Sequence, residues 1–270
     1  MESPGLGRRL MNDRVRELVR RRPLVSFFLI AYAISWVAWG GAYLGLGMLG
    51  VVIGGFGPLL AAWIVTSIEG STLSWARRIV VWRVPLRSYV YALGLPVLLW
   101  LIMNLVLAVI GEPVHISLLG ERASAYLGTF VFVSLLGGGL EEPGWRGFAL
   151  PRLQARHSPL VATLILALFW GFWHLPLYGL GFVGPILYAF FYTYLYNRTG
   201  SILLCVLLHG GFTAALDNLI LTADSLTVDL VILAILVVGT LILIAATHGR
   251  LGSPHLQEAT PRVLTPVPVG

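Results

Sequence analysis

Eight apolar runs, each close to the length that a helix needs to cross a bilayer, constrain this chain more than any other feature. A hydrocarbon core about 30 Å thick requires about 20 apolar residues in an α-helix. Polar segments or segments with glycine and proline separate the runs, which is typical of successive membrane spans. The runs cover residues 24–46, 49–67, 88–110, 126–148, 160–179, 182–196, 201–221 and 226–246. We therefore predict an all-α, polytopic membrane protein with about eight transmembrane helices.

The composition excludes other classes of protein. Hydrophobic residues make up 57% of the chain and charged residues only 11%, whereas a soluble domain carries about 25% charge. Intrinsic disorder needs the opposite balance, and the single cysteine, Cys205, excludes an internal disulfide framework. The sequence predicts one transmembrane domain over residues 1–250, which begins with a basic cytoplasmic segment, 1–23. A proline-containing end, 251–270, is predicted to be a disordered cytoplasmic tail.

The distribution of arginine predicts the orientation. All 18 basic residues are arginine. With the N-terminus inside and eight spans, sixteen of them fall in cytoplasmic segments, Arg122 falls outside and Arg146 lies within a run. This bias predicts a multi-pass membrane protein with both termini in the cytoplasm, and it explains the net charge of +6 without a nucleic-acid partner. The lysine-free composition favours a GC-rich prokaryote, and hence its plasma membrane.

Ionisable residues inside the runs are candidates for function, because they are costly to insert into a bilayer. In the fourth run, Glu142 and Arg146 are four residues apart and can pair on one helical face. Glu141 is left without a fixed partner, so we interpret it as a candidate general base. The alternative is a structural glutamate–arginine pair in a glycine-rich packing helix.

Two histidines lie at depths similar to that of these carboxylates. At a rise of about 1.5 Å per residue, His174 in the fifth run lies about 20 Å from the membrane surface at which that run begins. Glu141 in the fourth run lies at a similar distance from the opposite surface. His209 in the seventh run lies about 12 Å deep. We therefore expect these groups to meet in an intramembrane catalytic cavity. Asp217 and Asn218 lie further along the seventh run and are interpreted as structural.

These segments resemble a known family. The stretch Glu141-Glu142-Pro143-Gly144-Trp145-Arg146, the later Trp173-His174-Leu175-Pro176, and His209 are similar to motifs of the CAAX prenyl protease and bacteriocin-processing family, called CPBP or Abi. These are intramembrane glutamic endopeptidases, and the similarity covers about a third of the chain. The resemblance implies hydrolysis of a peptide bond at the membrane without a catalytic metal or other cofactor.

The resemblance also implies roles for individual residues. Glu141, with His174, would hold and deprotonate the attacking water, and Glu142 and Arg146 would support them. His209 would donate a hydrogen bond to the developing oxyanion. Two positions depart from the family pattern. Trp170 replaces a phenylalanine four residues before His174 and keeps its bulk, and Thr213 replaces an asparagine four residues after His209, which leaves a hydroxyl as the second oxyanion donor.

Two alternatives remain open at the level of sequence. One is a zinc-dependent membrane protease that uses His174, His209 and a glutamate, although no His-Glu-x-x-His motif occurs. The other is a non-catalytic polytopic protein, either a small transporter or an immunity or scaffold protein, because intramembrane carboxylates also serve proton relays. The predicted partners are the lipid bilayer and a peptide or protein substrate presented at the membrane. Prenylation of the substrate and the oligomeric state are not encoded in any motif.

Overall fold

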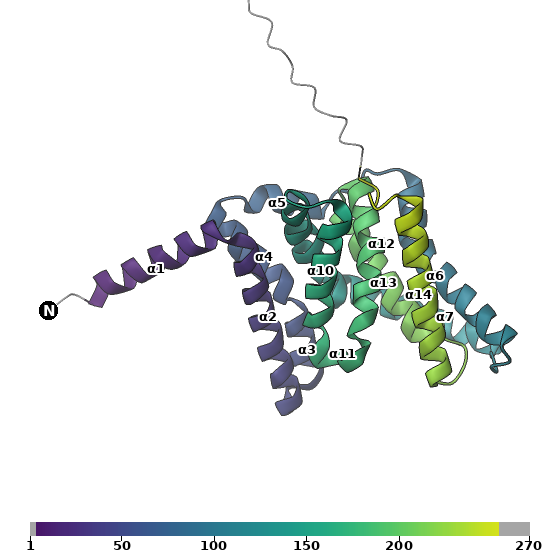
Figure 1. Ribbon diagram of the computed structural model, residues 1–270. Helices are drawn as coiled ribbons and strands as arrows, with labels where there is room; N and C mark the ends of the chain where they lie inside the picture. The colour runs from purple at the N-terminus through teal and green to yellow at the C-terminus, as the bar shows by residue number, and fades with distance from the viewer. Residues whose placement is uncertain (1–3, 254–270) are drawn as a thin grey trace, which may run out of the picture.

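The computed structural model describes residues 4–253, and within this range it contains helices and no strand (Figure 1). The predicted all-α fold is therefore confirmed. The main helices are α1 (Pro4–Arg21), α2 (Pro23–Gly41), α3 (Gly47–Gly55), α4 (Gly57–Glu69), α5 (Thr72–Ile79), α6 (Leu86–Val109), α7 (Leu119–Leu136), α10 (Pro159–Trp173), α12 (Val183–Thr199), α13 (Ile202–Asn218) and α14 (Leu226–Ala246). Short helical turns are η1 (Ala42–Leu46), η2 (Ile116–Leu118), η3 (Gly138–Glu141), α8 (Glu142–Gly144), η4 (Trp145–Ala149), α9 (Leu150–Gln154), α11 (Leu175–Tyr178) and η5 (Gly179–Phe182).

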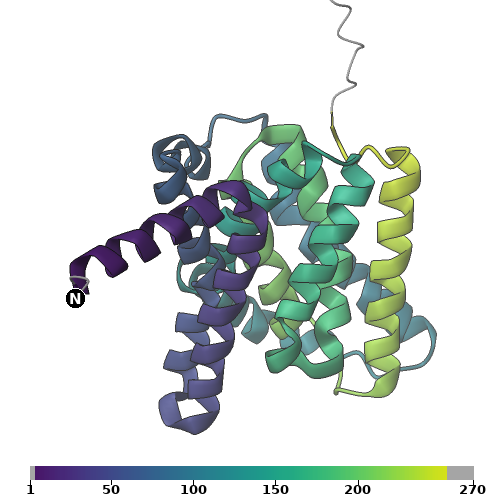
Figure 2. The same ribbon diagram turned by 60° about the vertical axis from the view of Figure 1, so that its left-hand side comes forward.

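The apolar helices agree with the predicted runs. Five helical segments are long and apolar enough to cross a membrane: Pro23–Gly55, Leu86–Val109, Ile116–Gln154, Leu175–Thr199 and Leu226–Ala246. Three shorter apolar helices, Gly57–Glu69, Pro159–Trp173 and Ile202–Asn218, occupy the remaining runs. The count of about eight is thus consistent with the structure. The chain is an integral membrane protein whose helices pack into one bundle, as Figure 2 shows.

The first two apolar runs fold into a helical hairpin, and the helix of the second run is interrupted at Phe56. Gly45 (φ 118°) and Gly47 (φ 52°) adopt backbone angles that favour glycine, and α3 then folds back along α2. The two helices approach closely, because a Cβ atom on Gly50 would lie 2.8 Å from the Ala38 carbonyl oxygen. The second span consequently consists of two helices, α3 and α4, that meet at Phe56.

The fourth run differs most from its prediction. It was expected to be one helix over 126–148, but α7 ends at Leu136 and Gly137 leaves the helical conformation (φ −106°, ψ −143°). Successive short turns replace the helix as far as α9. Consecutive glycines weaken helix formation, and Pro143 lacks the N–H that would continue a helical ladder. Trp75 on α5 bonds to the displaced backbone, because its Nε1 donates to the Pro143 carbonyl at 2.9 Å.

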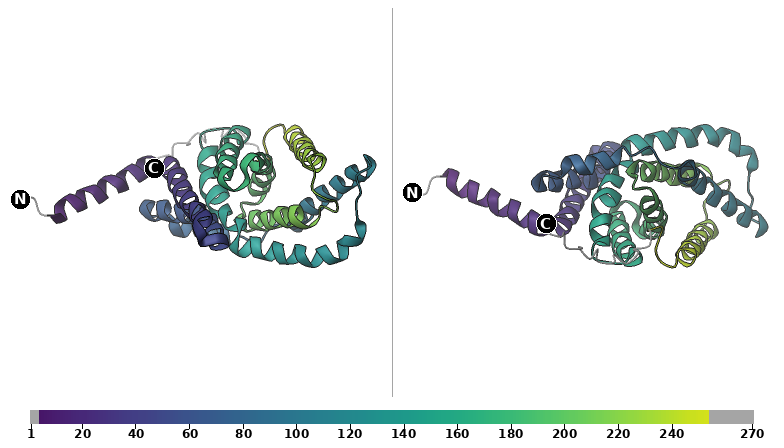
Figure 3. Two further views of the ribbon diagram at one scale, coloured as in Figure 1. Left: turned by 90° about the horizontal axis from the view of Figure 1, so that it is seen from below. Right: turned by 90° about the horizontal axis from the view of Figure 1, so that it is seen from above.

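The broken segment lies inside the bundle, where every residue from Glu141 to Leu150 is buried. Helix α4 packs against it from one side and α13 from another, while α10 pairs with α12 beyond it. Figure 3 shows α6 and α14 further out, and α1 projecting away from the other helices. Glu141, Glu142 and Arg146 therefore lie on turns that the bundle buries.

The segments that the arginine bias assigned to one side of the membrane connect helix ends at one end of the bundle. The starts of α2, α6, α10 and α13 lie at the upper end in Figure 1, as do the ends of α12 and α14. Arg122 lies at the opposite end, where its guanidinium donates to the Ile220 carbonyl. Which end faces the cytoplasm stays a prediction.

The first residues of the predicted tail pack against the bundle. Leu251 is fully buried, and its carbonyl accepts a hydrogen bond of 2.9 Å from Asn197 Nδ2. Residues 251–253 thus belong to the packed domain. The rest of the predicted disordered tail, 254–270, lies outside the described residues.

Candidate active site

Glu142 is the centre of a buried charged network. Its Oε1 accepts hydrogen bonds from Arg146 Nη1 and from His209 Nδ1, each at 2.9 Å. The side chains of Glu142 and Arg146 are completely inaccessible to solvent, and that of His209 is nearly so. The spacing of four residues had predicted the pair with Arg146. The contact with His209 comes from α13, which packs across the broken segment.

Aromatic rings enclose the guanidinium of Arg146. Its Cζ lies 4.0 Å from the centroid of the Trp170 ring and 4.3 Å from that of the Tyr192 ring. Desolvated cation–π contacts of this kind each contribute about 2 kcal/mol. The same two rings meet the His209 imidazole edge-to-face, at centroid distances of 5.8 and 5.7 Å. The aromatic side chains therefore fix both partners of Glu142.

Glu141 forms a second pair with His174. Trp170 Nε1 donates to Glu141 Oε2 at 2.8 Å, and the same oxygen lies 3.9 Å from His174 Nε2. The other imidazole nitrogen, His174 Nδ1, donates to the Trp170 carbonyl at 2.8 Å. Because a carbonyl only accepts, Nδ1 carries the proton and Nε2 of the neutral ring is an acceptor. Two acceptor atoms thus face each other across a distance that one water molecule can bridge.

The proline after His174 explains how the ring is presented. Pro176 has no N–H, so α10 ends at Trp173 and His174 lies in the turn before α11. Leu177 N bonds to the His174 carbonyl instead of to Trp173. The Trp173 carbonyl receives a hydrogen bond from a neighbouring helix instead, because Trp36 Nε1 on α2 donates to it at 3.0 Å. The tertiary contact with α2 therefore holds the broken end of α10 in place.

The most exposed parts of the site are the groups that could meet a substrate. Glu141, His174 and His209 retain 4%, 3% and 8% exposure, whereas Glu142 and Arg146 retain none. Gly138 lies beside His209 so closely that a Cβ atom there would collide with His209 Nε2. Any larger residue at position 138 would therefore displace the His209 ring.

The structure brings together five of the six predicted site residues. Thr213 follows His209 by about one helical turn on α13, but its side chain makes no hydrogen bond to any residue in the described range. Its predicted role at the oxyanion stays a prediction. Asn218, interpreted as structural, donates to Thr129 Oγ1 at 3.1 Å and to the Ala214 carbonyl of its own helix.

Two aromatic residues contribute to the site more than the sequence indicated. Tyr192 lies in an aromatic, apolar stretch of α12 and resembles an ordinary core residue. Trp170 was expected to replace phenylalanine only in bulk, but its indole N–H donates to Glu141 and its carbonyl orients His174. That expectation was incomplete, because the departure adds a hydrogen-bond donor that phenylalanine lacks.

The arrangement forms two pairs rather than one ligand cluster. Within residues 4–253, no three histidine, cysteine, aspartate or glutamate side chains are placed to hold a common metal ion. Glu142 bonds to His209 and Arg146, while Glu141 faces His174. The site therefore presents one carboxylate–imidazole pair locked by an arginine and one that is free to hold a small polar molecule.

Fold and site together define a helical integral membrane protein with buried glutamate–histidine pairs. Residues 123–215, which include all six predicted site residues, match the family of Rce1-like type II CAAX prenyl endopeptidases. A similar protein is CAAX prenyl protease 2 of Methanococcus maripaludis, with 30% identity over 127 residues, which cover 40% of this chain and 44% of that protein. The chain therefore spans less than half the length of this relative. These similarities support the predicted resemblance to the CAAX prenyl protease and bacteriocin-processing family over the segment that carries the site.

Proposed function

We propose that this protein is an intramembrane endopeptidase that hydrolyses a peptide bond near the membrane with water activated by Glu141 and His174. One observation carries the proposal: Glu141 Oε2 and His174 Nε2, both acceptors, lie 3.9 Å apart. A water molecule between them donates one proton to each, so its lone pairs point away from both acceptors. This is the orientation that attack on a carbonyl carbon requires.

The remaining groups support the same reaction. As the water oxygen bonds to the carbonyl carbon, Glu141 takes a proton, and it returns this proton to the amine when the carbon–nitrogen bond breaks. His209 Nδ1 donates to Glu142, which directs Nε2 toward Gly138. In the doubly protonated ring, Nε2 donates to the oxyanion. Glu142 and Arg146 hold the ring in place, and Thr213 is the predicted second donor. No step in this proposal requires a metal ion.

The direct test is a cleavage assay with the purified full chain in detergent. A peptide library with mass-spectrometric detection, supplemented with matched farnesylated and unprenylated peptides, would show which bonds are cut. We expect cleavage that persists with EDTA and 1,10-phenanthroline and disappears in the Glu141→Gln variant. Cleavage abolished by chelators, together with one zinc per chain in elemental analysis, would instead establish the zinc-dependent alternative.

Trp170 gives a sharper prediction, as a residue that positions the two reacting groups. Trp170→Phe removes the N–H that donates to Glu141 but leaves an aromatic ring. A hydrogen bond to a charged group is worth about 1.5–3 kcal/mol, so we expect kcat to fall by about 10- to 100-fold. KM should change less than about twofold, because Trp170 contacts the catalytic pair and not the substrate. Steady-state kinetics on one cleaved peptide measures both constants.

Trp145→Phe is the matched control for this change. Trp145 is also fully buried in the same region, but its Nε1 has no hydrogen-bond partner in the described part of the chain. The control therefore loses the same volume without losing a hydrogen bond. Equal losses of kcat in the two variants would show that packing, and not the bond to Glu141, explains the effect.

A further inference from the structure

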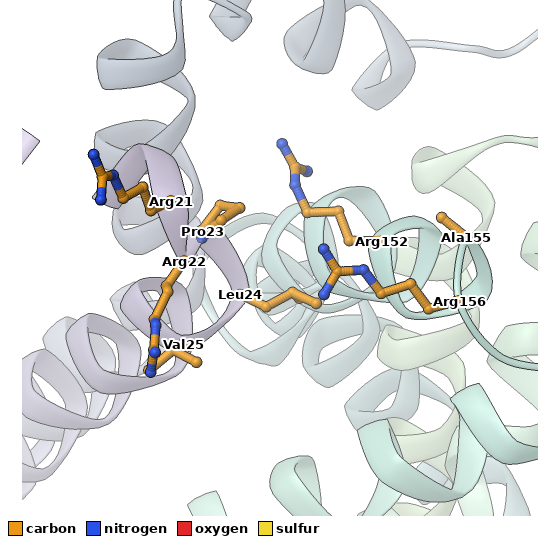
Figure 4. A pocket seen from close by; sticks show the side chains of 8 residues that line it. All are labelled: Arg21, Arg22, Pro23, Leu24, Val25, Arg152, Ala155 and Arg156. Carbon is orange, nitrogen blue, oxygen red and sulfur yellow. The ribbon is translucent and has the colours of Figure 1, made fainter. Parts of the chain in front are cut away.

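A cavity of about 510 Å³ lies at the arginine-rich end of the bundle, away from the glutamate–histidine pairs. The cavity lies between the junction of α1 and α2 and the end of α9 (Figure 4). The lining consists of arginine and apolar side chains: Arg21, Arg22, Pro23, Leu24, Val25, Arg152, Ala155 and Arg156. Four of these eight residues are cationic and none is acidic. The composition of the lining favours an anionic ligand.

Two of the four arginines are available to such a ligand. Arg152 is already paired with Glu69 at 2.6 Å and lies over the Phe148 ring, and Arg21 is paired with Glu17. In contrast, Arg22 and Arg156 are exposed, and their guanidinium groups make no hydrogen bond or ion pair within residues 4–253. Figure 4 shows Arg156 extending its guanidinium across the cavity toward Leu24. Arginine is well suited to phosphate, because its planar fork makes two parallel hydrogen bonds to the oxygens.

The apolar part of the lining continues along the outside of the bundle. Val25 is 51% exposed, and Leu29, one turn further along α2, is 67% exposed. Because α2 is one of the apolar helices expected to cross the membrane, this outer face is available to hydrocarbon chains. A ligand that fits both features has a phosphate at one end and a long apolar chain at the other. A peptide carboxylate fits only the first feature.

We propose that this cavity binds the phosphate of an anionic membrane phospholipid through Arg22 and Arg156, with the acyl chains along the outer face of α2. Basic pockets between helices at a membrane surface commonly hold such headgroups. Arg152 and Arg21 add positive charge at the rim although they are already paired. The lipid would thus bridge α1, α2 and α9, which are brought together at this end of the molecule.

The test compares two double variants that remove the same charge. Arg22→Gln with Arg156→Gln removes the unpaired cavity arginines, while Arg14→Gln with Arg16→Gln removes two exposed arginines of α1 that do not line the cavity. Binding of phosphatidylglycerol to the full chain is titrated by native mass spectrometry from detergent. We expect the first double variant to bind at least about tenfold more weakly than the native chain, and the second to bind within about twofold of it.

Three competition experiments identify the chemical class of the ligand. Phosphatidylcholine, inorganic phosphate and a short peptide with a free carboxylate are each added as competitors of phosphatidylglycerol. Weak competition by all three supports the anionic lipid. Inorganic phosphate that binds as tightly as the lipid would assign the cavity to a soluble phosphate, and effective displacement by the peptide would assign it to a substrate terminus. Equal losses in the two double variants would also overturn the proposal, because they would indicate nonspecific electrostatic attraction.

Discussion

Replacing Glu141 with glutamine is expected to lower the rate of peptide cleavage by roughly 10²- to 10⁴-fold, the usual contribution of a general base. Glutamine has nearly the same size, and its amide oxygen still accepts from Trp170 Nε1. The amide cannot take a proton from the attacking water, however, so the proposed base is lost while the hydrogen bond to Trp170 is kept. The measurement is the single-turnover cleavage rate, with thermal unfolding in the same detergent as the check on folding.

Glu69→Gln is the matched control for this prediction. Glu69 lies at the end of α4 and pairs with Arg152, outside the two glutamate–histidine pairs. The same chemical change there should leave the cleavage rate within about twofold of the native rate, because no group of the proposed reaction is altered. Full activity in the Glu141→Gln variant would remove the proposed base, and with it the mechanism.

The sequence predicted those features of the site that local spacing determines. Glu142 and Arg146 pair because residues four apart meet on a helical turn, even though the turn belongs to a broken segment. The estimated depths also predicted that His174 and His209 approach the carboxylates, and the structure places His174 3.9 Å from Glu141 and His209 2.9 Å from Glu142. Which histidine meets which glutamate depends on how α13 and α10 pack against the turns. No periodicity in a single chain encodes that packing.

Other features depend on tertiary contacts that look like ordinary hydrophobic sequence. Tyr192 and Trp170 lie in apolar helices, yet they enclose Arg146 from two sides. The break after Leu136 follows from three glycines and a proline, which the sequence shows, but hydropathy alone could not place the end of α7. Trp36 stabilises the end of α10 from a distant helix, because its indole N–H donates to the Trp173 carbonyl in place of the Leu177 N–H, which bonds to His174 instead.

The largest effect on stability is expected from Arg146→Met. The guanidinium and its partner Glu142 are both completely buried. Methionine roughly preserves the volume between Trp170 and Tyr192 but leaves the Glu142 carboxylate without its cationic partner. Breaking a buried pair in this way costs about 3–5 kcal/mol, so we expect a large loss in the free energy of unfolding or failure to accumulate. Denaturant unfolding in detergent, followed by tryptophan fluorescence, measures the loss.

Two comparisons distinguish the stability lost through the unpaired buried carboxylate from the stability lost through altered packing. Arg21→Met breaks a glutamate–arginine pair with the same four-residue spacing on the exposed surface of α1, where the two side chains are 76% and 53% exposed. There we expect a loss below about 1 kcal/mol, because solvent screens the charges. Adding Glu142→Gln to Arg146→Met should restore part of the lost stability, since the unpaired carboxylate is then absent. If Arg146→Met cost no more than Arg21→Met, or if Glu142→Gln made it worse, the locked pair would not be the structural centre that holds His209 in place.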